Sequence, residues 1–134
     1  MNTAAVNAKA LFFDVFGTLV DWRTSVAREA ELILHPQGFH LDWMAFADAW
    51  RAEYQPGMEE VRSGKTPFSK LDVLHRRNLE RFLPRLEVRN LSDATLHELT
   101  QSWHRLDAWF QSYLRMRSGG AKGYHRGRAK ETAS

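Results

Sequence analysis

The fold is decided by the stretch Lys9-Ala10-Leu11-Phe12-Phe13-Asp14-Val15-Phe16-Gly17-Thr18-Leu19-Val20-Asp21. Its apolar run is short and nearly continuous, which favours a strand buried on both faces of a sheet. Gly17 and Thr18 end that run in a turn. No other stretch of the sequence combines this length with a similar enrichment in β-branched or aromatic residues. The sequence therefore predicts one central buried strand and its turn within residues 8–22, in a chain that is otherwise mostly α-helical.

Beyond Trp22 the apolar residues recur every three or four positions, the period of amphipathic helices. The first helix is predicted to begin at Thr24 or Ser25. The second is capped by Asp42 and is expected to end before Pro56-Gly57, and further helices are expected from about residues 69 and 92. Residues 23–109 are thus predicted to form a helical subdomain of about four helices. The predicted core positions include Phe46, Trp50, Leu74, Asn78, Leu79, Phe82, Leu96, Leu99 and Trp103.

Charge divides the 134 residues at Trp109. Six of the 19 basic residues follow that tryptophan and Glu131 is the only acid there, so the tail carries a net charge of +5 and residues 1–109 carry −2. The tail is rich in Gly, Arg and Lys and is expected to be disordered. The chain has no Cys, which excludes disulfides and thiolate metal sites. The N-terminal residues lack the pattern of a signal peptide, and no apolar run is long enough to span a bilayer, so a cytoplasmic location is expected.

Asp14 is the leading candidate for chemistry. In open α/β folds ligands bind beyond the carboxyl ends of the strands, and a carboxylate that precedes a tight turn there is presented to a cleft. Gly17 and Thr18 supply such a turn. The simpler interpretation is an Asp that only stabilises the turn.

The same stretch resembles the first motif of the haloacid dehalogenase superfamily, an apolar strand followed by Asp-x-x-Gly-Thr-Leu. Phosphatases of that superfamily carry a second Asp two residues after the nucleophile, where this sequence has Phe16. An aromatic residue there is typical of the 2-haloacid dehalogenase branch, which needs no metal. The resemblance implies an α/β, haloacid dehalogenase-like (Rossmann-type) core represented only by its first strand, with a helical cap over residues 23–109.

Trp50-Arg51 resembles a Trp-Arg pair on an early cap helix of these dehalogenases. The helical spacing of Ala47, Trp50, Arg51 and Tyr54 places Arg51 at the margin of the buried stripe. The alternative role for Arg51 is to cover apolar surface with its aliphatic stem.

The resemblance implies a catalytic mechanism in which Asp14 attacks C2 of a 2-haloalkanoate and water hydrolyses the resulting ester. Arg51 would hold the substrate carboxylate and the departing halide, and Thr18 would bond within the turn. Val15 and Phe16 would lie against the substrate. No cofactor and no metal are implied, the partners are a small 2-haloacid and its halide, and family members are commonly dimers through the cap.

The resemblance ends near Trp109, and the later motifs of the family cannot be placed in residues 110–134. The sequence is therefore expected to be a truncated or frameshifted product. Oligomerisation or aggregation is expected as well, because a lone strand and the core-facing side of a cap expose apolar surface.

Three alternatives remain open. The chain is a non-catalytic remnant, or the basic tail binds nucleic acid, or the chain is a phosphatase of the same superfamily, against which Phe16 argues. A zinc site is not expected, since His97 and His104 have no carboxylate partner at ligand spacing. Lys65 in Ser-Gly-Lys-Thr-Pro is only a weak match to a phosphate loop.

Overall fold

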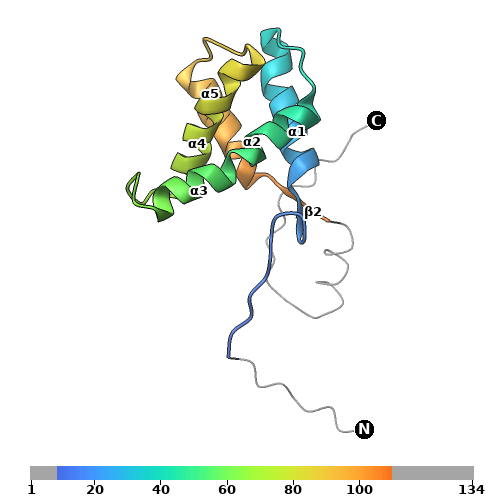
Figure 1. Ribbon diagram of the computed structural model, residues 1–134. Coiled ribbons are helices and arrows are strands. Elements are labelled where there is room, and N and C mark those ends of the chain that lie inside the picture. Colours follow the sequence, from blue (N-terminus) through green and yellow to red (C-terminus); the bar gives the residue numbers. More distant parts are fainter. Residues whose placement is uncertain (1–8, 110–134) are drawn as a thin grey trace.

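A computed structural model describes residues 9–109. This part of the chain contains five α-helices, with short 3₁₀ turns after the first, fourth and fifth, and two strands of two residues each that pair with one another (Figure 1). The helices are α1 (Trp22–Leu34), α2 (Trp43–Ala52), α3 (Tyr54–Arg62), α4 (Leu71–Phe82) and α5 (Asp93–Gln101). The 3₁₀ turns are η1 (His35–Gln37), η2 (Leu83–Leu86) and η3 (Ser102–His104), and the strands are β1 (Val20–Asp21) and β2 (Asp107–Ala108).

Side-chain caps fix where three of the helices begin. Asp42 accepts the Ala45 N–H at 2.9 Å, and Ser92 caps α5 in the same manner, so both predicted starts are confirmed. The predicted start of the first helix at Thr24 or Ser25 is wrong. Asp21 caps α1 instead, because its carboxylate accepts the Thr24 N–H at 3.1 Å. The caps each satisfy a backbone donor that would otherwise lack a partner.

Helix α3 contains Pro56-Gly57, which the sequence predicted to lie beyond a helix end. Helix α2 ends at Ala52, Glu53 lies outside both helices, and α3 begins at Tyr54. Pro56 therefore lies in the first turn of α3. Backbone N–H groups there have no partner within the helix, so the N–H that proline lacks costs no helical hydrogen bond. Gly57 lets this turn approach α4 closely, since a Cβ atom at this position would lie 2.8 Å from Leu74 Cδ1.

An aromatic cluster forms the centre of the helical core. Trp50 and Phe46 from α2 contact Phe82 from α4 at ring distances of 6.1 and 5.1 Å, and all three side chains are at most 1% exposed. Aliphatic residues of α1, α4 and α5 surround the cluster, among them Val26, Leu34, Leu79 and Leu99. Burial of such large apolar side chains is the main stabilising contribution, and truncating one to alanine typically costs about 3–5 kcal/mol.

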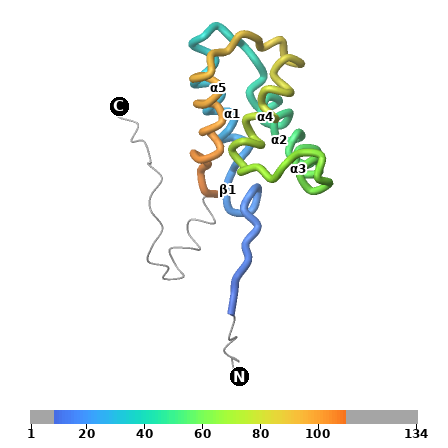
Figure 2. The backbone as a smooth tube through the Cα atoms, turned by 90° about the vertical axis from the view of Figure 1, so that its left-hand side faces the viewer, coloured from blue at the N-terminus to red at the C-terminus, as the bar shows by residue number. Residues whose placement is uncertain are grey.

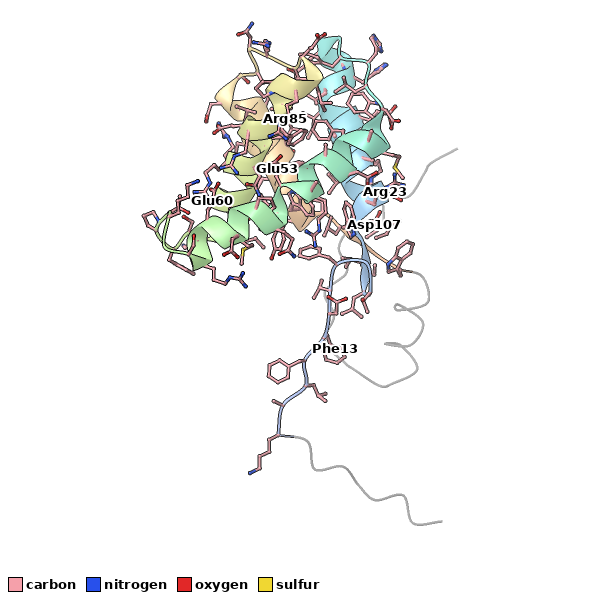
Figure 3. All side chains as sticks on the ribbon, in the orientation of Figure 1. Phe13, Arg23, Glu53, Glu60, Arg85 and Asp107 are labelled. Carbon is pink, nitrogen blue, oxygen red and sulfur yellow. The ribbon has the colours of Figure 1, made fainter. Side chains whose placement is uncertain are left out.

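The predicted buried strand before Asp14 is not formed. Residues 10–15 have no regular secondary structure and extend away from the helices (Figure 2). Phe12 is 96% exposed and Phe13 is 68% exposed, and Figure 3 shows Phe13 well away from the helical bundle. A strand requires a hydrogen-bonded neighbour. Within residues 9–109 the other strand is β2, which pairs with β1 rather than with this run.

The fold class itself is confirmed: the described chain is mostly helical and carries only a two-stranded remnant of a sheet. The antiparallel pairing aligns Val20 with Ala108 and Asp21 with Asp107. It brings the beginning and the end of the helical region side by side. Over residues 9–109, none of the helices combines the length and apolarity needed to cross a membrane. The predictions made for the basic tail concern residues 110–134, outside the described part.

Candidate functional site

The turn after Asp14 is held by a local network of hydrogen bonds. The carbonyl of Val15 accepts the N–H groups of Thr18, Leu19 and Val20 at 3.3, 2.9 and 3.2 Å. Gly17 adopts φ +83°, a left-handed conformation that side chains other than glycine rarely adopt. The Thr18 hydroxyl donates to Asp14 Oδ2 at 2.5 Å. The structure therefore presents the Asp14 carboxylate on an exposed turn and orients it through Thr18.

Arg51 lies near the end of α2 with its guanidinium among three aromatic rings. The guanidinium carbon is 4.5 Å from the ring centroid of Tyr54, 5.9 Å from that of Phe16 and 6.0 Å from that of Trp22. Ring faces attract a cation without neutralising its charge. Among residues 9–109 Arg51 forms no ion pair. The site therefore offers a half-buried positive charge to an anion.

Phe16 connects the two parts of the candidate site. It follows Asp14 by two positions, and its ring contacts both the Arg51 guanidinium and the edge of Trp103, the latter at 5.9 Å. Val15, in contrast, is 43% exposed and contributes its carbonyl to the turn. The structure thus groups Asp14 with Thr18 and Phe16 with Arg51.

His75 is a further polar residue of this region that the sequence analysis did not single out. Its ring stacks on Trp103 with centroids 4.4 Å apart and planes 4° apart, and it is 3% exposed. Burial lowers the pKa of His75 to about 4, and the nearby charge of Arg51 adds to this effect. His75 is therefore neutral at physiological pH. One sequence feature could have identified His75: it follows Leu74 directly and precedes Leu79 by four positions, on the apolar stripe of the helix.

The stacked rings of His75 and Trp103 contact aromatic residues that surround Arg51. Trp103 contacts Trp22 at 6.3 Å, and His75 contacts Tyr54 at 6.2 Å. The backbone carbonyl of His75 accepts the Trp50 indole N–H at 3.0 Å. Trp50 is thus a core residue whose single polar atom anchors α2 to α4.

The structure pairs His104 with a carboxylate that is distant in the sequence. His104 Nε2 lies 2.8 Å from Asp72 Oδ1, although 32 positions separate the two residues. No group of three or more potential metal ligands occurs within residues 9–109. Lys65 is exposed in the loop between α3 and α4.

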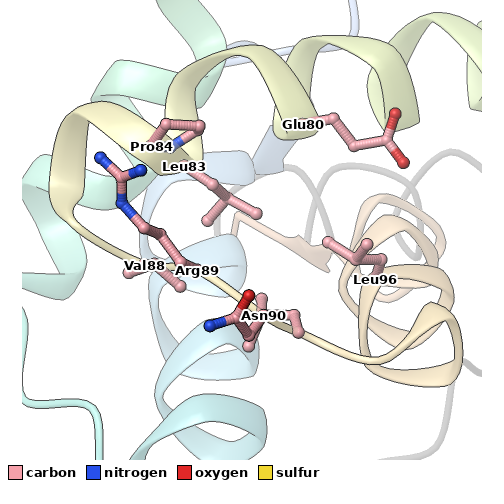
Figure 4. A pocket seen from close by; sticks show the side chains of 8 residues that line it. Glu80, Leu83, Pro84, Val88, Arg89, Asn90 and Leu96 are labelled. Carbon is pink, nitrogen blue, oxygen red and sulfur yellow. The ribbon is translucent and has the colours of Figure 1, made fainter.

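A hollow of about 330 Å³ lies far from this site, between η2 and the start of α5 (Figure 4). Its lining mixes apolar residues with Glu80, Arg89 and Asn90. Glu80 is already paired with Arg76 at 2.6 Å. The hollow shares no residue with the Asp14 turn or with the surroundings of Arg51.

Solved structures similar to this chain share both fold and sequence with it. A defluorinating L-2-haloacid dehalogenase is 39% identical with a TM-score of 0.74, and the match covers 78% of this chain and 44% of that enzyme. Another L-2-haloacid dehalogenase is 38% identical with a TM-score of 0.70, and the match covers 78% of this chain and 45% of that enzyme. No family model and no curated protein matches the chain.

The chain thus spans less than half of the length of either enzyme. The match still extends over most of the described residues, at an identity well above the level at which only the fold is shared. Over 78% of its length the chain therefore resembles L-2-haloacid dehalogenases of the haloacid dehalogenase superfamily, in sequence as well as in fold.

Proposed function

We propose that the chain takes part in the hydrolytic removal of halide from 2-haloalkanoic acids, with Asp14 as the nucleophile. One observation carries the proposal. The turn that presents the Asp14 carboxylate also carries Phe16, whose ring contacts the guanidinium of Arg51. The turn that carries the nucleophile therefore also contacts the cation that would bind a negatively charged substrate, and displacement on such a substrate uses both groups.

The reaction proposed has two steps. An Asp14 carboxylate oxygen attacks C2 of the substrate, the C2–halogen bond breaks, and the halide leaves with the bonding electron pair. Water then adds to the aspartyl carbonyl, which releases the 2-hydroxy acid and a proton and restores the carboxylate. Arg51 neutralises the substrate carboxylate and the halide. Thr18 orients the nucleophile, and Val15 and Phe16 border the substrate.

The helical region of residues 23–109 acts in this proposal as a cap beside the Asp14 turn. Its α2 supplies Arg51, and its aromatic residues exclude water from the reacting atoms. A homodimer through this region and a cytoplasmic location complete the proposal. Light scattering of the purified chain tests the dimer, and cell fractionation tests the location.

Halide release separates this function from the alternatives. The full chain is incubated with L-2-chloropropionate, chloride is measured by ion chromatography, and the intact protein is weighed by mass spectrometry. We expect chloride release that is lost in Asp14→Asn and retained in Asp93→Asn, whose carboxylate is 90% exposed on α5.

The two steps can be resolved in the same experiment. If water attack is slow in this chain, about one chloride per chain is released, and the protein gains the mass of the substrate less hydrogen chloride. If the chain neither releases chloride nor gains mass, it is a non-catalytic remnant. Magnesium-dependent phosphate release from p-nitrophenyl phosphate would instead identify a phosphatase.

A further inference from the structure

Trp109 contacts the nucleophile turn from the far end of the described chain. Its indole N–H donates to the carbonyl of Gly17 at 3.2 Å, across 92 positions of sequence. Its backbone N–H donates to the carbonyl of Leu19 at 3.0 Å. Trp109 therefore binds two carbonyls of the turn, that of Gly17 through its side chain and that of Leu19 through its backbone.

Several hydrogen bonds within the turn are local. Those of the Val15 carbonyl, the bond from Gly17 N–H to the Val20 carbonyl, and the bond between Thr18 and Asp14 all join residues within five positions. The segment before Asp14 is extended and exposed, so it gives the turn no support. Local bonds can shape a turn, whereas contacts with distant residues fix its orientation. Such contacts include those of the Phe16 ring with Arg51 and Trp103 and the two hydrogen bonds from Trp109.

The segment that carries Trp109 is itself fixed to α1. Asp107 N–H donates to Ser25 Oγ at 3.0 Å, and the Ser25 hydroxyl donates to the Asp21 carbonyl. Asp107 also forms an ion pair with Arg28. Because β2 is held by α1 and by β1, the Trp109 indole has a stable base from which to bind Gly17.

We propose that Trp109 is a positioning residue for Asp14, acting through the Gly17 carbonyl. The indole bond fixes the peptide that precedes Thr18, and Thr18 in turn holds the Asp14 carboxylate. The role of this position in catalysis rests on the function proposed above, whereas its effect on the turn does not. Trp109 as a whole residue is 42% exposed, so burial alone does not account for a tryptophan at this position.

The test removes the indole donor and keeps the shape of the side chain. Trp109 is replaced by 3-benzothienylalanine, in which sulfur takes the place of the N–H group, in the full chain labelled with ¹⁵N. The control carries the same replacement at Trp43, a half-buried residue of α2 whose indole makes no hydrogen bond within residues 9–109. Amide exchange is followed residue by residue by NMR.

We expect amide exchange at Thr18, Leu19 and Val20 to accelerate about tenfold in the Trp109 variant, while exchange in α2 and α4 stays as in the parent chain. The Trp43 variant should leave the turn unchanged. Unaltered exchange at the turn, or an equal acceleration throughout the chain, would overturn the proposal. Where the parent chain releases chloride, kcat should fall with little change in KM. If it releases none, the proposed function fails while amide exchange still decides the role of Trp109.

Discussion

The guanidinium carbon of Arg51 lies 4.5 Å from the centre of the Tyr54 ring, three positions further along the chain at the start of α3. Glu53, in the same part of the backbone, is paired instead with Arg85 and Arg81 on another face of the bundle. Arg51 is thereby held by ring faces rather than by a carboxylate. This arrangement orients the charge and leaves it available to an anion from outside the helical region.

Replacing Tyr54 tests how Arg51 is held. Tyr54→Leu should weaken binding of 2-chloropropionate about two- to fivefold, because a cation–π contact of this kind contributes about 0.5–1 kcal/mol. Tyr54→Phe keeps the ring and should bind as the parent chain does. Isothermal titration calorimetry with the Asp14→Asn background, which prevents turnover, gives the affinities. An equal loss in both variants would contradict the role assigned to the ring.

The close approach of α3 and α4 predicts that Gly57→Ala destabilises the protein. The added Cβ atom would lie 2.8 Å from Leu74 Cδ1 and 2.9 Å from Asn78 Oδ1, and both neighbours are at most 2% exposed. The crowding outweighs the gain in helix propensity, so we expect a net loss of about 1 kcal/mol in urea unfolding. In an Asn78→Ala background the same change should cost less. Equal costs in both backgrounds would exclude this contact as the cause.

Burial of His75 makes stability depend on pH. Its pKa falls from the ordinary 6.5 to about 4, so between these values the unfolded chain binds a proton that the folded chain does not. The free energy of unfolding should therefore drop as pH falls through this window, by about 2 kcal/mol between pH 7 and pH 5. Urea unfolding at several pH values should show this slope in the parent chain and a shallower one in His75→Gln. The same slope in both would assign the dependence to other groups.

The ion pairs of this protein should differ in their contribution to stability according to burial. Arg85 Nη1 lies 2.6 Å from Glu53 Oε1, and the Glu53 side chain is only 10% exposed. Arg85→Met should cost about 1 kcal/mol, because it removes the closest partner of a buried carboxylate. Arg62 pairs with Glu59 in the open, with side chains 81% and 55% exposed, so Arg62→Met should cost less than about 0.5 kcal/mol. Chemical denaturation measures both, and the reverse order would contradict the prediction.

The exposed apolar segment before Asp14 predicts self-association. Leu11, Phe12 and Phe13 are between 68% and 96% exposed and lie in an extended chain with unpaired backbone groups. Such segments pair with one another between molecules. Phe12→Lys should shift the chain towards monomer in sedimentation velocity runs over a concentration series. Phe68→Lys, at an equally exposed loop position, should not. A parent chain that is monomeric throughout would refute the expectation.

Much of the helical region was predictable because it depends on local patterns. The stripe through Phe46 and Trp50, the cap at Asp42 and the helix start near Ser92 were predicted correctly, since a cap and an apolar period need only neighbouring residues. The break at Glu53 was not, because a Pro in the first turn of a helix and a Pro beyond its end give the same local signal.

The sequence by itself determined that Asp14 precedes a glycine turn, that Arg51 borders an apolar helix face, and that the chain resembles a 2-haloacid dehalogenase. These features follow from the order of residues along the chain. Tertiary structure alone decided that Leu11–Phe13 stay unpaired, that His75 stacks on Trp103, and that Trp109 reaches Gly17. The physical reason is that strand pairing, burial and a bond across 92 positions each depend on a partner that no local pattern specifies.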